Sequence, residues 1–199
     1  MIEIERKFIL ADDDKERIIK NAEFLHERTF VDTYYDKSDF VLTSQDKWLR
    51  CRNGKFELKA PLRQRTRGFA DQYREVENEQ EIKKILNLPL NSSLNRSLKK
   101  NGYVPFCVCT TTREKYRNAQ FTIDFDTANF ECFTYTLAEI EVMVQDEKEI
   151  GNAIKQIVNF ARKQNLILAP TRGKIIEYLK NFKPKHYLTL VQAGIVNDP

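Results

Sequence analysis

Pairs of charged residues that stand two positions apart restrict the fold of this 199-residue chain more than any other feature. In a β-strand, residues i and i+2 lie on the same face, about 6.6 Å apart. The residue between the two charges is mostly apolar, so each pair indicates a strand with one charged face and one apolar face. Seven predicted strands carry such a set: Glu3/Glu5 with Lys7, Arg50/Arg52, Glu57/Lys59, Glu75/Glu77, Arg113/Lys115, Asp124/Asp126 and Glu139/Glu141.

Most of these pairs are alike in sign, which is unusual for strands that face water. A solvated strand face mixes lysine with neutral polar residues, whereas three strands here carry only carboxylates and one carries only guanidinium groups. Taken alone, the strand from Glu3 to Lys7 would be interpreted as the wet edge of a sheet. Its repetition along the chain favours strands whose charged faces turn inward. We therefore predict an α+β fold, a closed eight-stranded antiparallel β-barrel with a charged interior, surrounded by helices.

The expected elements follow from apolar periodicity and from turn and capping residues. The first strand covers residues 1–10, with a register slip expected near Arg6. Asn53 and Gly54 predict a two-residue hairpin turn. Further strands are expected at residues 24–35, 47–52, 55–60, 69–78, 103–116, 120–126 and 134–144. Helices are expected at residues 12–22, 79–86, 93–101, 148–164, 171–181 and 184–191.

Composition and charge narrow the class of protein. The net charge is only +4, and mixed acidic and basic walls disfavour a nucleic-acid groove, which would be basic throughout. No apolar run reaches membrane-spanning length and the first ten residues carry four charges, so we expect neither a membrane segment nor a signal peptide. The four cysteines match neither a zinc motif nor a redox pair, which favours reduced thiols in the cytoplasm. We expect one monomeric domain over residues 1–199, with C-terminal helices at about 171–193 packed on the barrel.

The charged interior predicts the chemistry of the ligand. Divalent cations would compensate the inward carboxylates, and a polyanion would compensate the arginines and lysines. A metal-chelated phosphate chain carries both charges. The sequence Arg172-Gly173-Lys174 holds only the last pair of a P-loop, with neither a preceding strand nor the first glycine, so a P-loop is not expected. No serine or cysteine stands in a nucleophile motif, which leaves water as the nucleophile.

The first strand, Glu3-Ile4-Glu5-Arg6-Lys7, resembles the Glu-x-Glu-x-Lys signature of the triphosphate tunnel metalloenzymes, also called the CYTH superfamily. Within the superfamily, the chain is most similar to the animal thiamine triphosphatases. The blocks that carry this resemblance are residues 2–8, 32–36, 48–52, 57–61, 73–75, 124–128, 139–141 and 174–187. Residues 62–71 and 87–112 do not align, and residues 130–137 lack the glycines of that pattern. The first of these segments includes a basic loop with Arg63, Arg65 and Arg67.

The resemblance implies a role for each matching residue. The metal-side carboxylates would be Glu3, Glu5, Asp124, Glu139 and Glu141. The residues that hold the triphosphate would be Lys7, Arg50, Arg52, Lys59, Arg113 and Lys174. Tyr34 and Lys59 match a tyrosine–lysine pair that helps to activate water, and Lys7 is grouped with them as catalytic. Trp48 matches the aromatic residue that stacks on the thiamine group, although a lone tryptophan more often has a packing role.

The activity that the resemblance implies is hydrolysis of a terminal phosphoanhydride, with Mg²⁺ or Mn²⁺ as cofactor. Thiamine triphosphate is the favoured substrate, and one small-molecule triphosphate is the only partner expected. Two alternatives stay open: an inorganic tripolyphosphatase, and a polyphosphate-binding module without hydrolysis. Pure anion binding would not need so many carboxylates, which disfavours the binding module. A cyclase acting on ATP is disfavoured because no feature of the sequence marks an adenine pocket.

Overall fold

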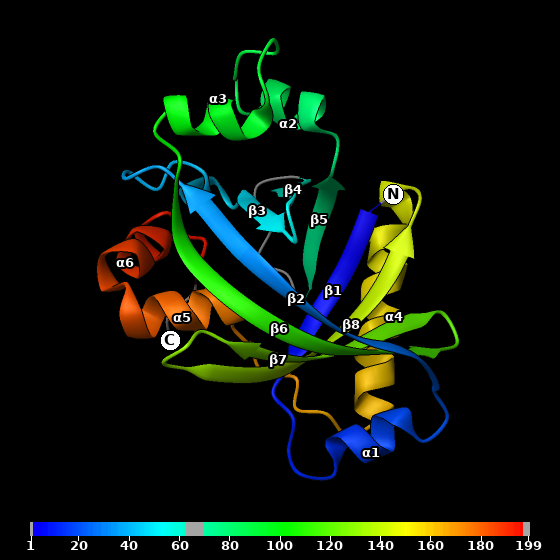
Figure 1. Cartoon of the computed structure of the whole chain (residues 1–199). Coiled ribbons are helices and arrows are strands. Elements are labelled where there is room, and N and C mark those ends of the chain that lie inside the picture. The colour runs from blue at the N-terminus through cyan, green and yellow to red at the C-terminus, as the bar shows by residue number, and fades with distance from the viewer. Residues whose placement is uncertain (1, 63–69, 197–199) are drawn as a thin grey trace.

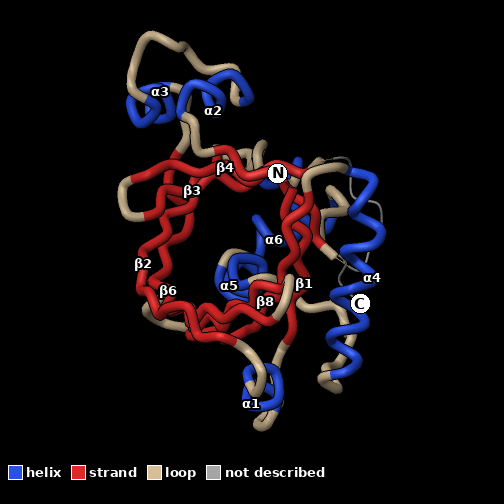
Figure 2. The backbone as a smooth tube through the Cα atoms, turned by 90° about the vertical axis from the view of Figure 1, so that its right-hand side faces the viewer, coloured by secondary structure: helices blue, strands red, loops and turns tan. Residues whose placement is uncertain are grey.

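The computed structural model describes residues 2–62 and 70–196, and its strands close into an antiparallel barrel in the order β1-β5-β4-β3-β2-β6-β7-β8 (Figures 1 and 2). The predicted α+β barrel of eight strands is confirmed. The strands are β1 (Ile2–Phe8), β2 (Glu23–Asp36), β3 (Trp48–Arg52), β4 (Lys55–Pro61), β5 (Asp71–Val76), β6 (Val104–Asn118), β7 (Phe121–Asn129) and β8 (Thr134–Val144). The helices are α1 (Asp14–Ile19), α2 (Glu79–Ile85), α3 (Leu94–Lys100), α4 (Ile150–Lys163), α5 (Lys174–Phe182) and α6 (Pro184–Gln192), with short 3-10 turns η1 (Thr43–Gln45) and η2 (Glu147–Glu149).

Apolar residues on the outer face of the barrel pack under the helices. Helix α4 lies along β1 and β8, where Ile4, Ile140 and Ile157 are fully buried in one cluster (Figure 2). Helices α2 and α3 cover the outer faces of β3 and β4 through a second cluster that includes Leu58 and Leu94. The alternation along each strand therefore divides the chain into an apolar exterior and a charged interior, as the spacing of the charged pairs predicts.

The register slip that we expected near Arg6 is wrong. Strand β1 pairs with β8 without interruption from Ile2, opposite Val144, to Phe8, opposite Ala138. Arg6 instead keeps its place on the outer face, where it is buried and its guanidinium donates a hydrogen bond of 2.8 Å to the carbonyl oxygen of Leu168. A buried charge that finds backbone oxygen nearby can occupy an apolar face without a bulge in the strand.

The hairpin between β3 and β4 has the turn that the sequence predicts. Asn53 and Gly54 have φ angles of 47° and 86°, in the left-handed region that a two-residue hairpin of this type requires. The turn fixes the register, so that Arg50 stands opposite Glu57 and Trp48 opposite Lys59. Four side chains of the charged face are thereby aligned by one local turn.

Helices α5 and α6 lie at one end of the barrel, where Figure 2 shows them behind the ring of strands. Leu179 and Leu190 are fully buried there in a cluster that includes Tyr34 of β2. Across the described residues, no helix is long and apolar enough to cross a membrane. That residues 1–199 form a single domain stays a prediction. The basic loop with Arg63, Arg65 and Arg67 lies outside the described residues.

Candidate active site

The predicted metal ligands come from three adjacent strands and meet on the inner wall of the barrel. Glu5 of β1 stands opposite Glu141 of β8, and Glu139 stands opposite Asp124 of β7. Oxygen atoms of Glu3, Glu5 and Glu141 lie within 4.8 Å of one another, and the same holds for Asp124, Glu139 and Glu141. Glu141 belongs to both groups. Because hard divalent ions prefer carboxylate oxygen, the donor set fits Mg²⁺ or Mn²⁺.

Burial and crowding raise the pKa of several of these carboxyl groups. The pKa of Glu141 lies well above its ordinary value because the group is buried and Asp124 and Glu3 are close. Burial and the neighbouring Glu5 also raise the pKa of Glu139. Glu5 behaves in the opposite way, since Lys59 and Lys7 outweigh its burial and lower its pKa. The wall therefore holds more negative charge around Glu141 than the adjacent cations neutralise.

This arrangement predicts that Glu141→Gln stabilises the metal-free protein at neutral and alkaline pH. The pKa of Glu141 is higher in the folded protein than in the unfolded chain. As pH rises above about 4.5, the carboxyl group therefore ionises first in the unfolded chain. The folded state loses stability over this range until pH exceeds the raised pKa. Glutamine removes that loss, and each kcal/mol recovered raises Tm by about 2–4 °C in a chain of this size.

The measurement is the Tm of both proteins in chelator between pH 4 and pH 9. The gain should vanish near pH 4, where the carboxyl group is protonated in both states. Glu16→Gln, on the exposed surface of α1, is the matched control and should leave Tm unchanged. An equal shift in both variants, or a loss in Glu141→Gln, would contradict the assigned electrostatics.

Two predicted triphosphate ligands face the carboxylates of β7. The Arg113 guanidinium, on β6, donates two hydrogen bonds to Asp126, of 2.5 and 2.7 Å, and one of 2.9 Å to Glu139. Lys174 begins α5, and its ammonium lies 3.0 Å from Asp126 and 3.1 Å from the hydroxyl of Thr111. Lysine side chains on helices are mostly exposed to solvent, whereas Lys174 is buried inside the end of the barrel.

Two further predicted ligands project from β3. Arg52 makes two hydrogen bonds of 2.8 Å to Asp32 of β2 and stacks 3.9 Å above the ring of Phe30. Arg50 donates to Glu57 at 2.7 Å. Since Phe30 also lies 5.8 Å from the Arg113 guanidinium and 5.5 Å from the Lys174 ammonium, one ring is shared by three cations of the predicted set.

Lys59 and Lys7 bridge the basic and acidic parts of the wall. The Lys59 ammonium lies 2.7 Å from Glu3 and 3.3 Å from Glu5. Lys7 contacts Glu5 and lies 2.8 Å from Asp71. Burial alone would lower the pKa of both lysines, but these carboxylates raise each pKa well above its ordinary value. Both lysines therefore stay charged through the physiological range.

Helix α5 begins directly above Lys7. A side chain added at Gly173, just before α5, would place its Cβ 3.2 Å from the Cε of Lys7. This distance is shorter than most Cβ contacts. The absence of a side chain at Gly173 therefore lets the start of α5 approach Lys7 closely. The sequence Arg172-Gly173-Lys174, which we rejected as a P-loop, therefore has a packing role at this end of the barrel.

Tyr34 and Trp48 lie at the same end. Tyr34 stands opposite Arg50, and burial raises the pKa of its hydroxyl. Trp48 shares a strand face with Arg50 and Arg52 and packs against the cluster formed by α5 and α6. Its indole nitrogen donates a hydrogen bond of 2.9 Å to Asp46.

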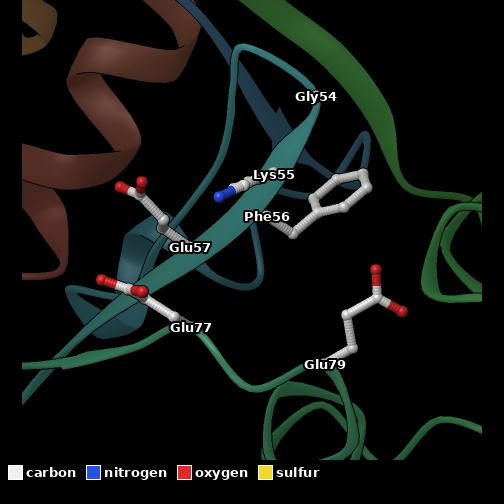
Figure 3. Close-up of a pocket in the computed structure, with 6 residues that line it drawn as sticks. All are labelled: Gly54, Lys55, Phe56, Glu57, Glu77 and Glu79. Carbon is white, nitrogen blue, oxygen red and sulfur yellow. The ribbon is translucent and has the colours of Figure 1, made fainter.

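A separate pocket lies at the rim of the barrel, around the β3–β4 hairpin (Figure 3). Lys55 and Glu57 project from one face of β4 and Phe56 from the other, and two further carboxylates, Glu77 and Glu79, complete the lining. None of the predicted site residues, all of which are described, lines this pocket. Glu57 links it to the interior because its carboxylate also pairs with Arg50.

The structure adds site residues that the sequence analysis did not single out. Asp32 and Asp46 are buried carboxylates beside predicted ligands, and Phe30 is the ring shared by three cations. The sequence could have indicated Asp32, because it stands two residues before Tyr34 and therefore lies on the same inner face of β2. The roles of the predicted residues stay predictions, although ion pairs join several of the predicted carboxylates to predicted cations.

Comparison with known proteins places the chain in a family. A scan against protein families matches residues 1–169 to the CYTH domain. The chain belongs to the CYTH family. The match covers all eight strands of the barrel and ends before α5. This CYTH chain is similar to thiamine-triphosphatase from Homo sapiens, with 29% identity over 212 residues that cover 98% of the chain and 91% of the human protein.

Solved structures share the barrel fold of this chain. The PH1819 protein from Pyrococcus horikoshii OT3 matches with a TM-score of 0.64 and 22% identity, over 90% of this chain and 99% of that one. HpAC1 from Hippeastrum, described as having a dominant triphosphatase activity, matches with a TM-score of 0.55 and 16% identity, over 90% and 95% of the two chains. At these identities, the likeness is one of fold.

Proposed function

We propose that this CYTH protein is a metal-dependent hydrolase that cleaves the terminal phosphoanhydride of thiamine triphosphate, giving thiamine diphosphate and phosphate. The observation that carries the proposal is the inner wall of the barrel. Two clusters of three carboxylates, which have Glu141 in common, lie there beside buried cations. A triphosphate chain with a divalent ion complements both kinds of charge. The similarity to human thiamine-triphosphatase over 98% of the chain supports thiamine as the organic part.

The carboxylates that would hold the metal are Glu3, Glu5, Asp124, Glu139 and Glu141. A divalent ion held by these residues, Mg²⁺ or Mn²⁺, would supply positive charge that offsets the negative charge developing on the phosphate oxygens during cleavage. The raised pKa of Glu141 supports this assignment, because a bound cation would remove the repulsion that now disfavours its charged form.

The basic residues would bind the triphosphate and the departing diphosphate. These residues are Lys7, Arg50, Arg52, Lys59, Arg113 and Lys174, and each now pairs with a carboxylate. Tyr34 and Lys59 would act as hydrogen-bond donors that orient water or a phosphate oxygen. Because their raised pKa values keep both protonated, neither is suited to remove a proton from the attacking water.

An inorganic tripolyphosphatase is the second candidate. What supports it is that the six basic side chains could bind phosphate oxygens, which both substrates have, so they would give no preference for an organic group. The two carboxylate clusters disfavour a binding module without hydrolysis, because they would repel a phosphate chain that lacked a metal ion.

The setting proposed for the reaction is simple. A small-molecule triphosphate is the only partner, with no role for nucleic acid or a membrane. We place the protein in the cytoplasm as a monomer. The four cysteines, all among the described residues, are free thiols.

The test of the proposal is phosphate release from thiamine triphosphate, tripolyphosphate and ATP, compared in Mg²⁺ at neutral to alkaline pH. We expect the highest kcat/KM for thiamine triphosphate. A clear preference for tripolyphosphate would favour the second candidate. Binding of all three without phosphate release would favour the binding module.

Trp48→Ala should separate the first two candidates. The indole lies on the strand face that carries Arg50 and Arg52, so it can meet an organic group attached to a held triphosphate. Stacking and cation–π contact with thiamine contribute on the order of 0.5–2 kcal/mol. We expect kcat/KM for thiamine triphosphate to fall several-fold and tripolyphosphate hydrolysis to change little.

Two other outcomes have distinct meanings. Equal losses for both substrates, together with a lower Tm, would show that Trp48 only packs. No change for either substrate would place Trp48 outside the site and favour the inorganic triphosphatase.

A further inference from the structure

The buried carboxylate of Asp46 joins two aromatic side chains that come from different strands. One oxygen, Oδ1, accepts a hydrogen bond of 2.9 Å from the indole nitrogen of Trp48 on β3. The same oxygen accepts one of 2.9 Å from the hydroxyl of Tyr73 on β5. Only 4% of Asp46 is exposed, so both contacts are shielded from water. A charged acceptor in such a setting forms strong and directional hydrogen bonds.

The loop before β3 holds Asp46 in place. Its φ angle is +59°, and its backbone N–H donates to the carbonyl oxygen of Thr43 at 3.0 Å. Asp36 accepts hydrogen bonds from the backbone N–H groups of Leu42 and Thr43, at 3.0 and 2.8 Å, and from the Thr43 hydroxyl at 2.7 Å. His186 of α6 contacts that hydroxyl through Nε2, also at 2.7 Å. The loop is therefore anchored to the barrel and to α6.

We propose that Asp46 is a positioning residue for the organic end of the substrate and that it makes this end of the site selective for a cationic aromatic group. The inference rests on the proposed function, because it assigns a role to the side chains around Trp48. The indole nitrogen is its one donor, so this hydrogen bond together with the covalent attachment of the ring at Cβ restricts the rotation of the ring. Donation to a carboxylate also increases the electron density of the indole, which strengthens its attraction to a cation.

The negative charge of Asp46 determines which organic groups are favoured beside Trp48. A fixed carboxylate behind the ring favours a positively charged heteroaromatic group and gives no advantage to a neutral base. It also disfavours a phosphate at this position, which leaves the phosphate chain to the basic residues of β1, β3, β4, β6 and α5. The substrate class is therefore a triphosphate ester of a cationic aromatic alcohol, in preference to a nucleoside triphosphate.

The chain contains one tryptophan, so its fluorescence reports Trp48 alone. The experiment compares the wild type with Asp46→Ala and Asp46→Asn, and uses Asp39→Ala, an exposed carboxylate of the same loop, as the matched control. Time-resolved anisotropy of the ligand-free proteins measures the local mobility of the indole. Thiamine diphosphate and inorganic diphosphate are the binding probes, and thiamine triphosphate and tripolyphosphate are the substrates.

We expect Asp46→Ala to increase indole mobility and to lower kcat/KM for thiamine triphosphate by about tenfold, the size of one charge-assisted hydrogen bond, mainly through KM. Tripolyphosphate hydrolysis should stay within about twofold, since no phosphate contact changes. Asparagine keeps an acceptor oxygen, so Asp46→Asn should restore the anisotropy. It should still bind thiamine diphosphate more weakly than the wild type because the charge is gone.

Unchanged anisotropy in Asp46→Ala would overturn the proposal, and so would equal losses for both substrates. If Asp46→Ala does not fold, Asp46→Asn decides the matter. Weaker binding of thiamine diphosphate with unchanged binding of inorganic diphosphate supports the role, and wild-type binding of both refutes it. A wild type that hydrolyses no triphosphate would refute the proposed function, whereas the anisotropy and the diphosphate binding would still report on Asp46.

Discussion

Removal of divalent ions is expected to lower phosphate release from every triphosphate by at least about a thousandfold, a loss of about 4 kcal/mol in transition-state stabilisation. The reason is the carboxylate wall. Oxygen atoms of Glu3, Glu5 and Glu141 lie within 4.8 Å of one another, and a triphosphate would add further negative charge beside them. Without a cation between them, the substrate is repelled and the developing charge on its phosphate oxygens has no counterpart. Addition of Mg²⁺ or Mn²⁺ should restore the rate.

The experiment must separate metal held by the protein from metal held by the substrate, because triphosphates chelate Mg²⁺ themselves. Binding of Mn²⁺ to the protein in the absence of substrate answers this point. Glu141→Gln should weaken Mn²⁺ binding strongly, because Glu141 belongs to both carboxylate clusters. The control Glu16→Gln, on the exposed surface of α1, should leave Mn²⁺ binding unchanged. Full turnover in excess chelator after metal stripping would contradict the prediction.

The barrel was predictable because its charged pairs follow the two-residue period of a strand. The pairs at Asp124/Asp126 and Glu139/Glu141 all turn inward, while Ile140 between the last two is buried under α4. The wrong expectation came from Arg6, whose charge on the apolar face suggested a slip. A local pattern cannot show that the carbonyl oxygen of Leu168, 162 residues away, accepts its hydrogen bond.

Asp32 and Asp46 were not predicted from the sequence, for related physical reasons. Asp32 lies between Phe30 and Tyr34 on the inner face of β2, so no second carboxylate two residues away draws attention to it. Asp46 is not in a strand at all, and its role depends on a left-handed backbone conformation after η1. Arg52 becomes a neighbour of Asp32 only through the pairing of β2 with β3, and the contact between Asp46 and Trp48, two residues apart, depends on the backbone of the loop.

Arg113→Ala is expected to have the largest effect on stability of any single change in the wall. The guanidinium lies between Asp124, Asp126 and Glu139, and its pKa is raised well above the ordinary value because these carboxylates outweigh its burial. Removal of one partner from a buried ion pair costs about 3–5 kcal/mol, because the remaining charge stays buried without compensation. For a chain of this size, that corresponds to a fall in Tm of about 6–20 °C.

The pH dependence distinguishes lost charge compensation from lost packing. In the wild type, Arg113 and Lys174 outweigh the burial of Asp126 and lower its pKa, so the stability from this pairing is present above the unfolded pKa of about 3.8 and is lost as pH falls. The deficit of Arg113→Ala should therefore persist from neutral pH down to about pH 4 and should shrink as pH falls below that value, where the carboxyl groups take up protons.

The matched control is Arg117→Ala, on the same strand, where the arginine side chain is 60% exposed and lies 3.9 Å from Glu23. An exposed pair of this kind contributes about 0–1 kcal/mol, so Tm and activity should hardly change. Arg113→Lys should recover part of the stability, since the charge returns without the two-pronged contact to Asp126. Equal Tm values for Arg113→Ala and Arg117→Ala would show that the inner carboxylates do not need Arg113, because water or protons would then satisfy them.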